Sequence, residues 1–373
     1  MERAKASQIS DFPDGIQECG ADALRFGLLA YTVQGRDVNL DIKRVVGYRQ
    51  FCNKIWNAVR FLFAFLDDFT PGPTMHLEIA GNPHASPRDL FILSRLNNVI
   101  QEANRNIEQF VFGVCASALH SFFMYDFCDV YVELVKPVLN NRSEENADRR
   151  RCTQCTLYTC VEQYLRLLHP LMPFVTEELW QRLPFIANIS SSPSIMVAQY
   201  PQADVTWNNT IAENAMTIIK EAIHSARSLR SDYNIPNNMK ADFYFSTANH
   251  ELRETLISQE QDFCTLAKGN FLKPSPSAEM MPRGLCIKVV SDQLSIYINL
   301  EGIIDIDSEV ARLRKEEEKL NNQIGQYRKK IEAPGYETKV PETVRATNKD
   351  KLEAYEKELD MTIKAIENFL TMK

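Results

Sequence analysis

One stretch of the chain concentrates side chains that could contact a charged ligand. Between positions 42 and 66 the sequence holds five basic residues and no acidic residue, although the chain as a whole carries a formal charge of −7. The basic residues are Lys43, Arg44, Arg49, Lys54 and Arg60. This local reversal of charge favours a polyanion as partner. Because the net charge is negative, such a site must be a patch rather than a general property of the surface.

The groups that ordinarily perform catalysis form no recognisable constellation. The six histidines are scattered, and no glycine-rich phosphate loop or G-x-S-x-G motif occurs. CTQC, residues 152–155, has zinc-like spacing but lacks a second Cys or His pair, so these cysteines are expected to pack as small buried residues. Adjacent acids such as Asp67 and Asp68 are expected at helix ends. The residues alone therefore predict a binding module without a metal or a cofactor.

The cysteine count and the hydropathy pattern indicate a compartment. Nine cysteines are an odd number spread over 373 residues, so reduced thiols are expected rather than a secreted disulfide framework. We find no 18-residue apolar run and no signal peptide, which makes the cytoplasm the expected location.

The spacing of apolar residues in the basic stretch predicts an amphipathic helix, which would position the polar side chains. Phe51, Ile55, Ala58 and Leu62 form an apolar stripe that can face a core. The residues that fall off this stripe are Arg49, Asn53, Trp56, Asn57 and Arg60. Similar spacing predicts helices at 42–66, 88–106, 111–138, 143–168, 174–183 and 211–231, which together form a helical bundle. A shorter helix should follow residue 20, with Asp22 as its cap.

The pattern changes after Pro236. ADFYFST, GLCIKVVS and LSIYINL alternate like short strands, and a helix is expected at 251–266, so this part reads as a small α+β module. Heptad spacing then predicts two helices that fold back on each other as an antiparallel coiled-coil hairpin. The heptad residues are Ile306, Val310, Leu313, Leu320, Ile324, Tyr327 and Ile331, then Leu352, Tyr355, Leu359, Ile363, Ile366 and Leu370. The fold class is mainly α.

Several motifs in order resemble a known family. GADALRFGLLAYTVQGRDVNLD, GYRQFCNKIWNAVRF and HPLMPFVTEELWQRL resemble the C-terminal half of class I aminoacyl-tRNA synthetases of the valine, isoleucine and leucine group. ARSLRSDYNI, GIIDIDSEVARLRKEEEKL and YETKVPETV narrow the resemblance to the valyl-tRNA synthetases of the eukaryotic cytosolic type. The resemblance covers nearly the whole chain.

The resemblance implies four segments. They are the tail of the catalytic domain and stem-contact region (1–40), the anticodon-binding bundle (41–235), the α+β module (236–304) and a tRNA-binding coiled-coil arm (305–373). The adenylate-forming signatures His-x-Gly-His and Lys-Met-Ser-Lys-Ser are absent. We therefore expect no catalytic residues here, and expect ATP and Mg²⁺ to act in a catalytic domain that this chain lacks, together with the editing domain. The implied partner is valine tRNA, with other translation factors or synthetases as further candidates, and neither DNA nor a membrane is expected.

The resemblance gives the basic stretch a partner, the anticodon arm. Trp56 and Phe61 could stack on bases, Asn53 and Asn57 could read base edges, and Arg49, Lys54 and Arg60 could hold phosphates. The alternative places both rings in the core, which we favour for Trp56, and uses the amides as caps. For the cations we favour RNA, because no acidic residue of the same helix can pair with them.

The turn of the hairpin is a second candidate. Residues 328–351 hold seven basic and four acidic residues. The basic ones are Arg328, Lys329, Lys330, Lys339, Arg345, Lys349 and Lys351. By resemblance, this arm meets the outer corner of the tRNA. The competing hypotheses are a non-enzymatic coiled-coil interaction protein, or a tRNA-binding protein derived from a synthetase. An independent enzyme is a weaker possibility, because nothing in the titratable residues favours it.

Overall fold

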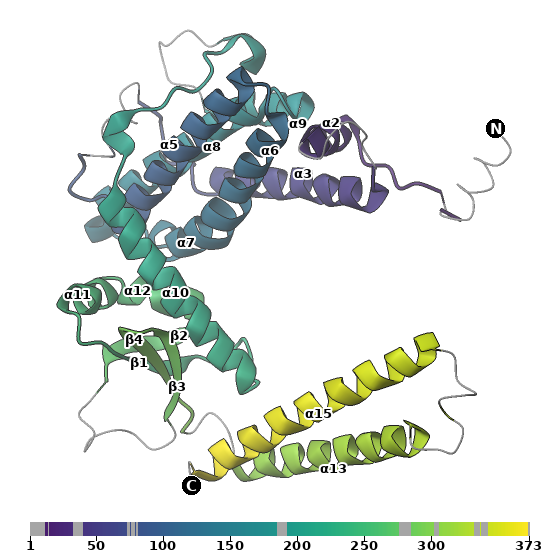
Figure 1. Cartoon of the computed structure of the whole chain (residues 1–373). Coiled ribbons are helices and arrows are strands. Elements are labelled where there is room, and N and C mark those ends of the chain that lie inside the picture. Colours follow the sequence, from purple (N-terminus) through teal and green to yellow (C-terminus); the bar gives the residue numbers. More distant parts are fainter. Residues whose placement is uncertain are drawn as a thin grey trace, which may run out of the picture. The chain divides into compact units, whose positions relative to one another are not determined.

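The computed structural model of the chain describes residues 12–13, 15–32, 40–72, 75, 79, 81–184, 192–275, 285–301, 306–331, 336 and 342–371. The chain divides into two compact units, Met1–Thr217 and Ile218–Lys373. This division does not test the four segments proposed from the sequence, which stay a prediction. Figure 1 shows a predominantly helical chain with one small sheet, so the predicted fold class is confirmed.

The first unit is a bundle of helices that begins after residue 20. Its α-helices are α2 (Ala21–Tyr31), α3 (Ile42–Phe63), α5 (Pro87–Glu108), α6 (Phe112–Ser121), α7 (Val132–Asn140), α8 (Ala147–Leu168), α9 (Pro173–Trp180) and the first part of α10 (Thr210–Asp232). The short helical turns are η3 (Glu144–Asn146), η4 (Ile195–Val197) and η5 (Val205–Trp207). The predicted helices of the bundle are present with ends shifted by a few residues, except that the one predicted over 111–138 is not a continuous α-helix.

Local capping explains where two of these helices begin. The Asp41 carboxylate accepts a hydrogen bond from the Lys43 amide at 2.9 Å, and α3 starts at the next residue after this cap. At α5, Ser86 and Asp89 form a reciprocal capping box, with Pro87 at the first helical position, where its missing N–H costs nothing. Both helices then bury one apolar face in the bundle core.

The centre of the bundle departs from the predicted continuous α-helix over 111–138. Between α6 and α7 the chain forms a π-helix, η2 (Phe122–Tyr131). Phe123, Phe127 and Tyr131 recur every four residues, and their rings lie in sequence along one face at 5.4 and 6.1 Å between centroids. Tyr164 of α8 stacks on Phe123 at 4.5 Å. The periodicity of the sequence could not distinguish a π-helix from an α-helix here, because the segment is apolar on nearly all sides.

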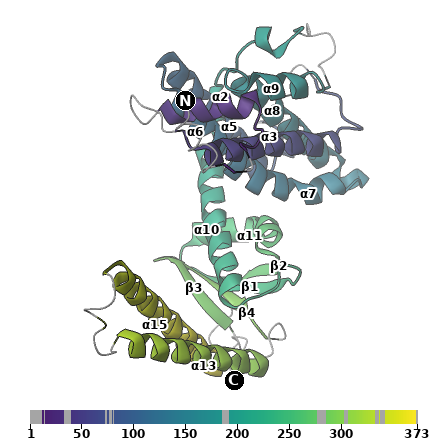
Figure 2. The same ribbon diagram turned by 90° about the vertical axis from the view of Figure 1, so that its right-hand side faces the viewer.

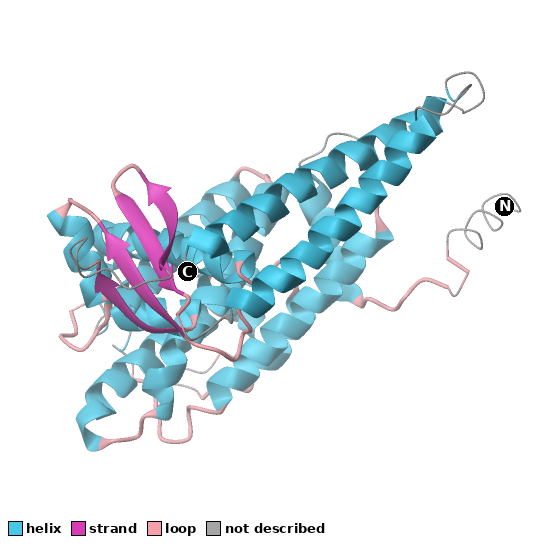
Figure 3. Ribbon diagram, turned by 90° about the horizontal axis from the view of Figure 1, so that it is seen from below, coloured by secondary structure: helices cyan, strands magenta, loops and turns pink. Residues whose placement is uncertain are grey.

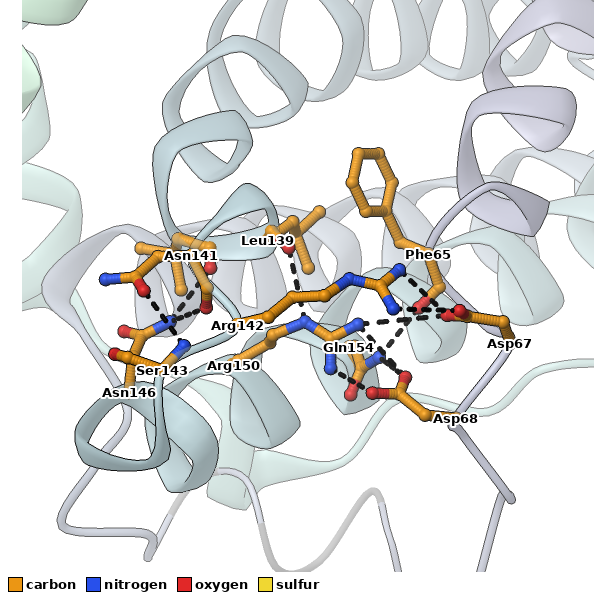
Figure 4. A network of polar contacts seen from close by, with 11 residues as sticks. Phe65, Asp67, Asp68, Leu139, Asn141, Arg142, Ser143, Asn146, Arg150 and Gln154 are labelled. Carbon is orange, nitrogen blue, oxygen red and sulfur yellow. Dashed lines mark hydrogen bonds and ion pairs between the residues drawn. The ribbon is translucent and has the colours of Figure 1, made fainter.

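A polar network joins the end of α3 to α7 and α8. In Figure 4, Arg142 and Arg150 point toward Asp67 and Asp68, the adjacent acids that follow α3. Arg150 forms two hydrogen bonds to Asp68 and donates from Nε to the Leu139 carbonyl at 3.2 Å. Gln154 donates to the same carboxylate at 2.9 Å. These acids lie in the turn four and five residues after the last residue of α3 rather than at the helix end itself, and Arg142 and Arg150 anchor that turn.

This network makes stability sensitive to acid. Hydrogen bonds from Arg150 and Gln154 lower the pKa of Asp68 from 3.8 to about 2. Because the pKa is lower in the folded chain, the contribution of Asp68 is complete above about pH 4 and is lost as the pH falls toward 2. We expect Asp68→Asn to destabilise the protein at pH 7 by roughly 1 kcal/mol, with solvent screening included. In urea titrations the difference from the parent should shrink toward pH 2; a difference that is constant with pH would contradict this role.

The second unit contains a four-stranded sheet. Its strands are β1 (Ala241–Ser246), β2 (Gly269–Pro274), β3 (Leu285–Ser291) and β4 (Leu294–Asn299), in the order β2-β1-β4-β3. Strands β1 and β2 are parallel, and the other pairs are antiparallel. Helices α11 (His250–Ser258) and α12 (Glu260–Ala267) connect β1 to β2. The sequence analysis missed β2, because GNFLKP shows no clear alternation and contains Gly and Pro.

The chain ends in a helical hairpin of α13 (Ile306–Ile331) and α15 (Glu342–Thr371), which lie side by side in Figures 1 and 3. The Tyr327 and Tyr355 rings are 5.7 Å apart, and nearer the turn Asn348 donates to the Tyr336 hydroxyl at 2.6 Å. The contacting pair nearer the turn is also the pair closer together in sequence, so the two helices are antiparallel. Of the predicted seam, Val310, Leu320, Ile324 and Ile366 are buried, whereas Ile363 and Leu370 are exposed.

Candidate nucleic-acid interface on helix α3

Helix α3 separates an apolar face from a polar one as its sequence predicts. Phe51, Ile55, Ala58 and Leu62 are all buried. Arg49, Asn53, Asn57 and Arg60 are exposed. Trp56 has 40% of its surface exposed, so placing it in the core was wrong. Trp56 lies off the apolar stripe, so its position on the helix determines its exposure more than its hydrophobicity does.

The polar face of α3 borders a cavity of about 790 Å³. Three segments far apart in sequence form its walls: the start of α2, the middle of α3 and the start of α9, which lie together in Figure 2. The lining residues are Cys19, Gly20, Ala21, Asp22, Arg49, Cys52, Asn53, Trp56, Phe174, Val175 and Glu178. The structure therefore brings Arg49, Asn53 and Trp56 together in one cavity.

Asp22 holds the walls of the cavity in place. Its carboxylate accepts hydrogen bonds from the amides of Phe174 at 3.2 Å and Val175 at 2.7 Å. Asp22 thus caps α9 across the fold, and the prediction that it caps its own helix was wrong; Gly20 occupies that position with φ of 83°. An anionic group at a helix N-terminus is favourable, since it meets unpaired N–H groups and the positive end of the helix dipole.

This cap positions an aromatic ring that the sequence analysis missed. Phe174 has 66% of its surface exposed, although it begins a helix of the bundle. Together with Trp56 it places two accessible rings on the cavity. Phe174 stands in the apolar run LMPFV, residues 171–175, so nothing in the sequence separates it from a core residue.

The charge balance of the cavity leaves Arg49 available. Glu178 is paired with Arg182 four residues later on the same face. The Arg182 guanidinium lies 5.8 Å from the centroid of the Trp56 ring. Within the described residues no carboxylate forms an ion pair with Arg49. A cation, an amide and two rings therefore face one apolar hollow, which suits a planar base with an adjacent phosphate.

The remaining predicted residues of α3 lie outside this cavity. Lys54 pairs with Asp129 of η2 at 3.4 Å. Its acidic partner therefore lies on a neighbouring element, since α3 itself has no acidic residue. Phe61 is partly buried, 5.0 Å from the Phe65 ring and 5.9 Å from Lys136 Nζ. Asn57 and Arg60 are exposed. The structure thus separates a cavity group from these four residues.

The predicted basic residues of the hairpin are mostly exposed. The exposed ones are Arg328, Lys329, Lys330, Lys349 and Lys351, and Arg345 is partly buried. Arg328 pairs with Glu356 at 2.5 Å, and Lys330 Nζ lies 5.0 Å from the Tyr327 ring. Lys339 lies outside the described residues. The described cations therefore present charge at the turn of a helical hairpin.

Metal binding finds no support among the described residues, where no group of three or more His, Cys, Asp or Glu side chains could hold an ion. Cys152, Cys155 and Cys160 are buried in α8, as expected for packing residues. Burial raises the pKa of Cys152 to about 12, which keeps it a neutral thiol. None of the described helices is long and apolar enough to cross a membrane.

Comparisons with known proteins identify what the chain is similar to, and neither family model that matches includes α3. Residues 89–245 match the anticodon-binding domain of tRNA ligases, and residues 305–368 match the valyl tRNA synthetase tRNA binding arm. The whole chain is 38% identical over 376 residues to a valine–tRNA ligase of Takifugu rubripes, of which it covers 30%. It is 38% identical over 375 residues to the human valine–tRNA ligase, covering 29%. A Caenorhabditis elegans valine–tRNA ligase is 39% identical over 372 residues, with 97% of the chain and 34% of the relative covered. The chain thus spans roughly a third of the length of these relatives.

Proposed function

We propose that this chain, which belongs to the valine–tRNA ligase family, is the part of such a ligase that recognises transfer RNA. The observation that carries the proposal is the cavity beside α3, where Arg49, Asn53 and Trp56 meet Phe174. Anticodon loops expose unpaired bases, and proteins read such bases by stacking them on rings and bonding to their edges. In this proposal Trp56 and Phe174 stack, Asn53 contacts a base edge, and Arg49 holds a phosphate.

The hairpin supplies a second contact in this proposal. Its exposed cations can bind phosphates whichever bases lie nearby, through the release of counterions. Arg60, Asn57 and Lys54 extend the contact along α3, with Lys54 contributing least because Asp129 already pairs with it. The cavity then provides discrimination, and the hairpin, meeting the outer corner of the tRNA, provides affinity.

We propose the ATP-dependent attachment of valine to its tRNA, in the cytoplasm, for a protein that contains both this part and the catalytic signatures. This is the reaction of the whole ligase. Neither signature occurs in these 373 residues. We therefore expect no valine-dependent pyrophosphate exchange by the purified chain above a buffer control. Exchange above that control would contradict the assignment, because the scattered polar groups here offer no preorganised site for a transferring phosphate.

The alternative function is a protein-binding role for the hairpin. Salt dependence separates the two: if the partner is tRNA, the logarithm of the affinity should fall with the logarithm of salt concentration at about 0.7 to 0.9 per phosphate contact. We expect a total slope of about −4 or steeper from contacts at both α3 and the hairpin. A flat response, as an apolar helix-in-groove contact would give, would favour the alternative.

A further inference from the structure

A second cavity, in the Ile218–Lys373 unit, lies where α10 and α12 end. Its volume is about 760 Å³. Three cations line it, Arg227, Arg230 and Lys268, with the neutral polar residues Ser231, Asn234 and Asn237. None of its ten lining residues carries a carboxylate, although the chain as a whole has more acidic than basic residues. A concave surface with this charge is selective for anions.

Arg230 is the fixed part of this site. Only 5% of its surface is exposed, and its guanidinium donates to three carbonyls: those of Lys268 at 3.2 Å, Pro236 at 2.8 Å and Met239 at 2.7 Å. Burial lowers the pKa of Arg230, and no carboxylate in the described part of the chain forms an ion pair with it. Its charge is therefore offset only by carbonyl dipoles, which leaves a positive potential in the cavity.

Arg227 and Lys268 provide the accessible donors. Arg227 uses Nε to bond the Leu266 carbonyl at 2.9 Å, and its two Nη groups have no partner among the described residues. Lys268 is exposed, and no carboxylate of the described part of the chain pairs with it. Its backbone has φ of 57°, a conformation in which glycine or asparagine is preferred.

The backbone around the cavity is unusual in the same place. Three described non-glycine residues have positive φ, and two of them, Asn234 and Lys268, line this cavity. Asparagine is common in this conformation, but lysine is not. Lys268 therefore adopts this conformation at some energetic cost, at a position that lines the cavity. The hydrogen bonds from Arg230 and from Arg227 Nε to backbone carbonyls are explained by the capping of helix ends. The Nη groups of Arg227 and the ammonium of Lys268 have no such role.

We propose that this cavity binds a phosphate group, through the Nη groups of Arg227 and the ammonium of Lys268, over the positive potential of Arg230. The phosphate could belong to the backbone of a bound RNA or to a small phosphorylated molecule. The first source rests on the proposed function, and the second is independent of it. Arginine suits this role because its planar fork can bond two phosphate oxygens at once.

The test uses the full chain and a double variant, Arg227→Gln with Lys268→Asn. Asparagine accepts the positive φ, and Arg230 is left intact, so the fold should survive. The matched control is Arg253→Gln with Lys273→Asn, which removes the same charge from exposed residues of the same unit that do not line the cavity. Thermal unfolding checks that all three proteins are folded.

Pyrophosphate binding, measured by calorimetry at low salt, gives the first readout. We expect about tenfold or greater weakening in the double variant and no change in the control, since each charge-assisted hydrogen bond contributes roughly one power of ten. This arm needs no RNA, so it stands even if the proposed function fails. The second readout is the salt slope of tRNA binding, which should decrease by about 0.7 to 0.9 in the double variant if the phosphate belongs to RNA.

The two readouts identify the source. Loss of pyrophosphate binding with an unchanged tRNA slope indicates a small phosphorylated ligand, and a reduced slope indicates an RNA phosphate. The proposal is overturned if neither ligand distinguishes the folded double variant from the control. In that case the three cations serve only to hold the ends of α10 and α12.

Discussion

A variant with Arg49→Gln and Trp56→Ala is expected to bind a tRNA carrying a valine anticodon about 100-fold more weakly than the parent chain. Stacking of a base on an aromatic ring contributes roughly 1 to 3 kcal/mol, and a lost phosphate contact adds to this. Discrimination against tRNAs with altered anticodons should fall at the same time, because Trp56 and Asn53 share the cavity. Dissociation constants measured by fluorescence anisotropy at one salt concentration would give both quantities.

The matched control for this variant is Lys54→Gln with Phe61→Leu. It also removes one cation and one aromatic ring from α3, but these side chains contact Asp129, Phe65 and Lys136 rather than the cavity. We expect its tRNA affinity to change less than about fivefold. If the control loses as much affinity as the cavity variant, α3 contributes general basic charge and the cavity is not a base-reading site. Urea unfolding of both variants excludes loss of structure as the cause.

Removing residues 302–373, and with them the hairpin, is expected to weaken the binding of all tRNAs by a similar factor, about 10- to 100-fold at physiological salt. The exposed cations of the hairpin supply the effect, and phosphate contacts carry no sequence information. The ratio between cognate and anticodon-swapped tRNAs should remain that of the full chain. The measurement is the same panel of dissociation constants, repeated at three salt concentrations to obtain the slopes.

A second variant separates charge from structure in the hairpin. Replacing Arg328, Lys329, Lys330, Lys349 and Lys351 by Gln keeps both helices and removes the charge. It should reproduce most of the effect of the deletion. If the deletion weakens binding and the neutral variant does not, the hairpin contributes by shape rather than by charge. If the deletion abolishes discrimination in a bundle that still folds and binds, the hairpin reads the anticodon and α3 is its scaffold.

The fold could be predicted from sequence where one element alone determines the outcome. The buried stripe of α3 follows from spacing within a single helix, and so do its exposed Arg49 and Asn53. The pairing of Lys54 with Asp129 could not be predicted, because the two residues are 75 positions apart and meet only through packing. The π-helical turns of η2 were hidden for a different reason, since an apolar helix reads alike in either form.

The candidate site illustrates the same limit. Its residues on α3 could be selected from composition, but the cavity also requires the starts of α2 and α9, and no local pattern links them. Asp22 is the clearest case: by sequence it caps its own helix, whereas in the fold it caps α9, about 150 residues away. The cation-lined cavity in the second unit could not be predicted from the sequence either, because the end of α10 and the loop after it form the cavity together with the end of α12.

Anticodon reading by the cavity beside α3 can be tested with a single substitution and two tRNA transcripts. The dissociation constants of the parent chain and of the Asn53→Ala variant are compared for two tRNA transcripts that differ only in the anticodon. We expect the parent to prefer the valine anticodon by about tenfold or more, and the variant to lose most of that preference while its affinity for the swapped tRNA stays nearly constant. Equal binding of both transcripts by the parent, or a preference unchanged in the variant, would contradict the account.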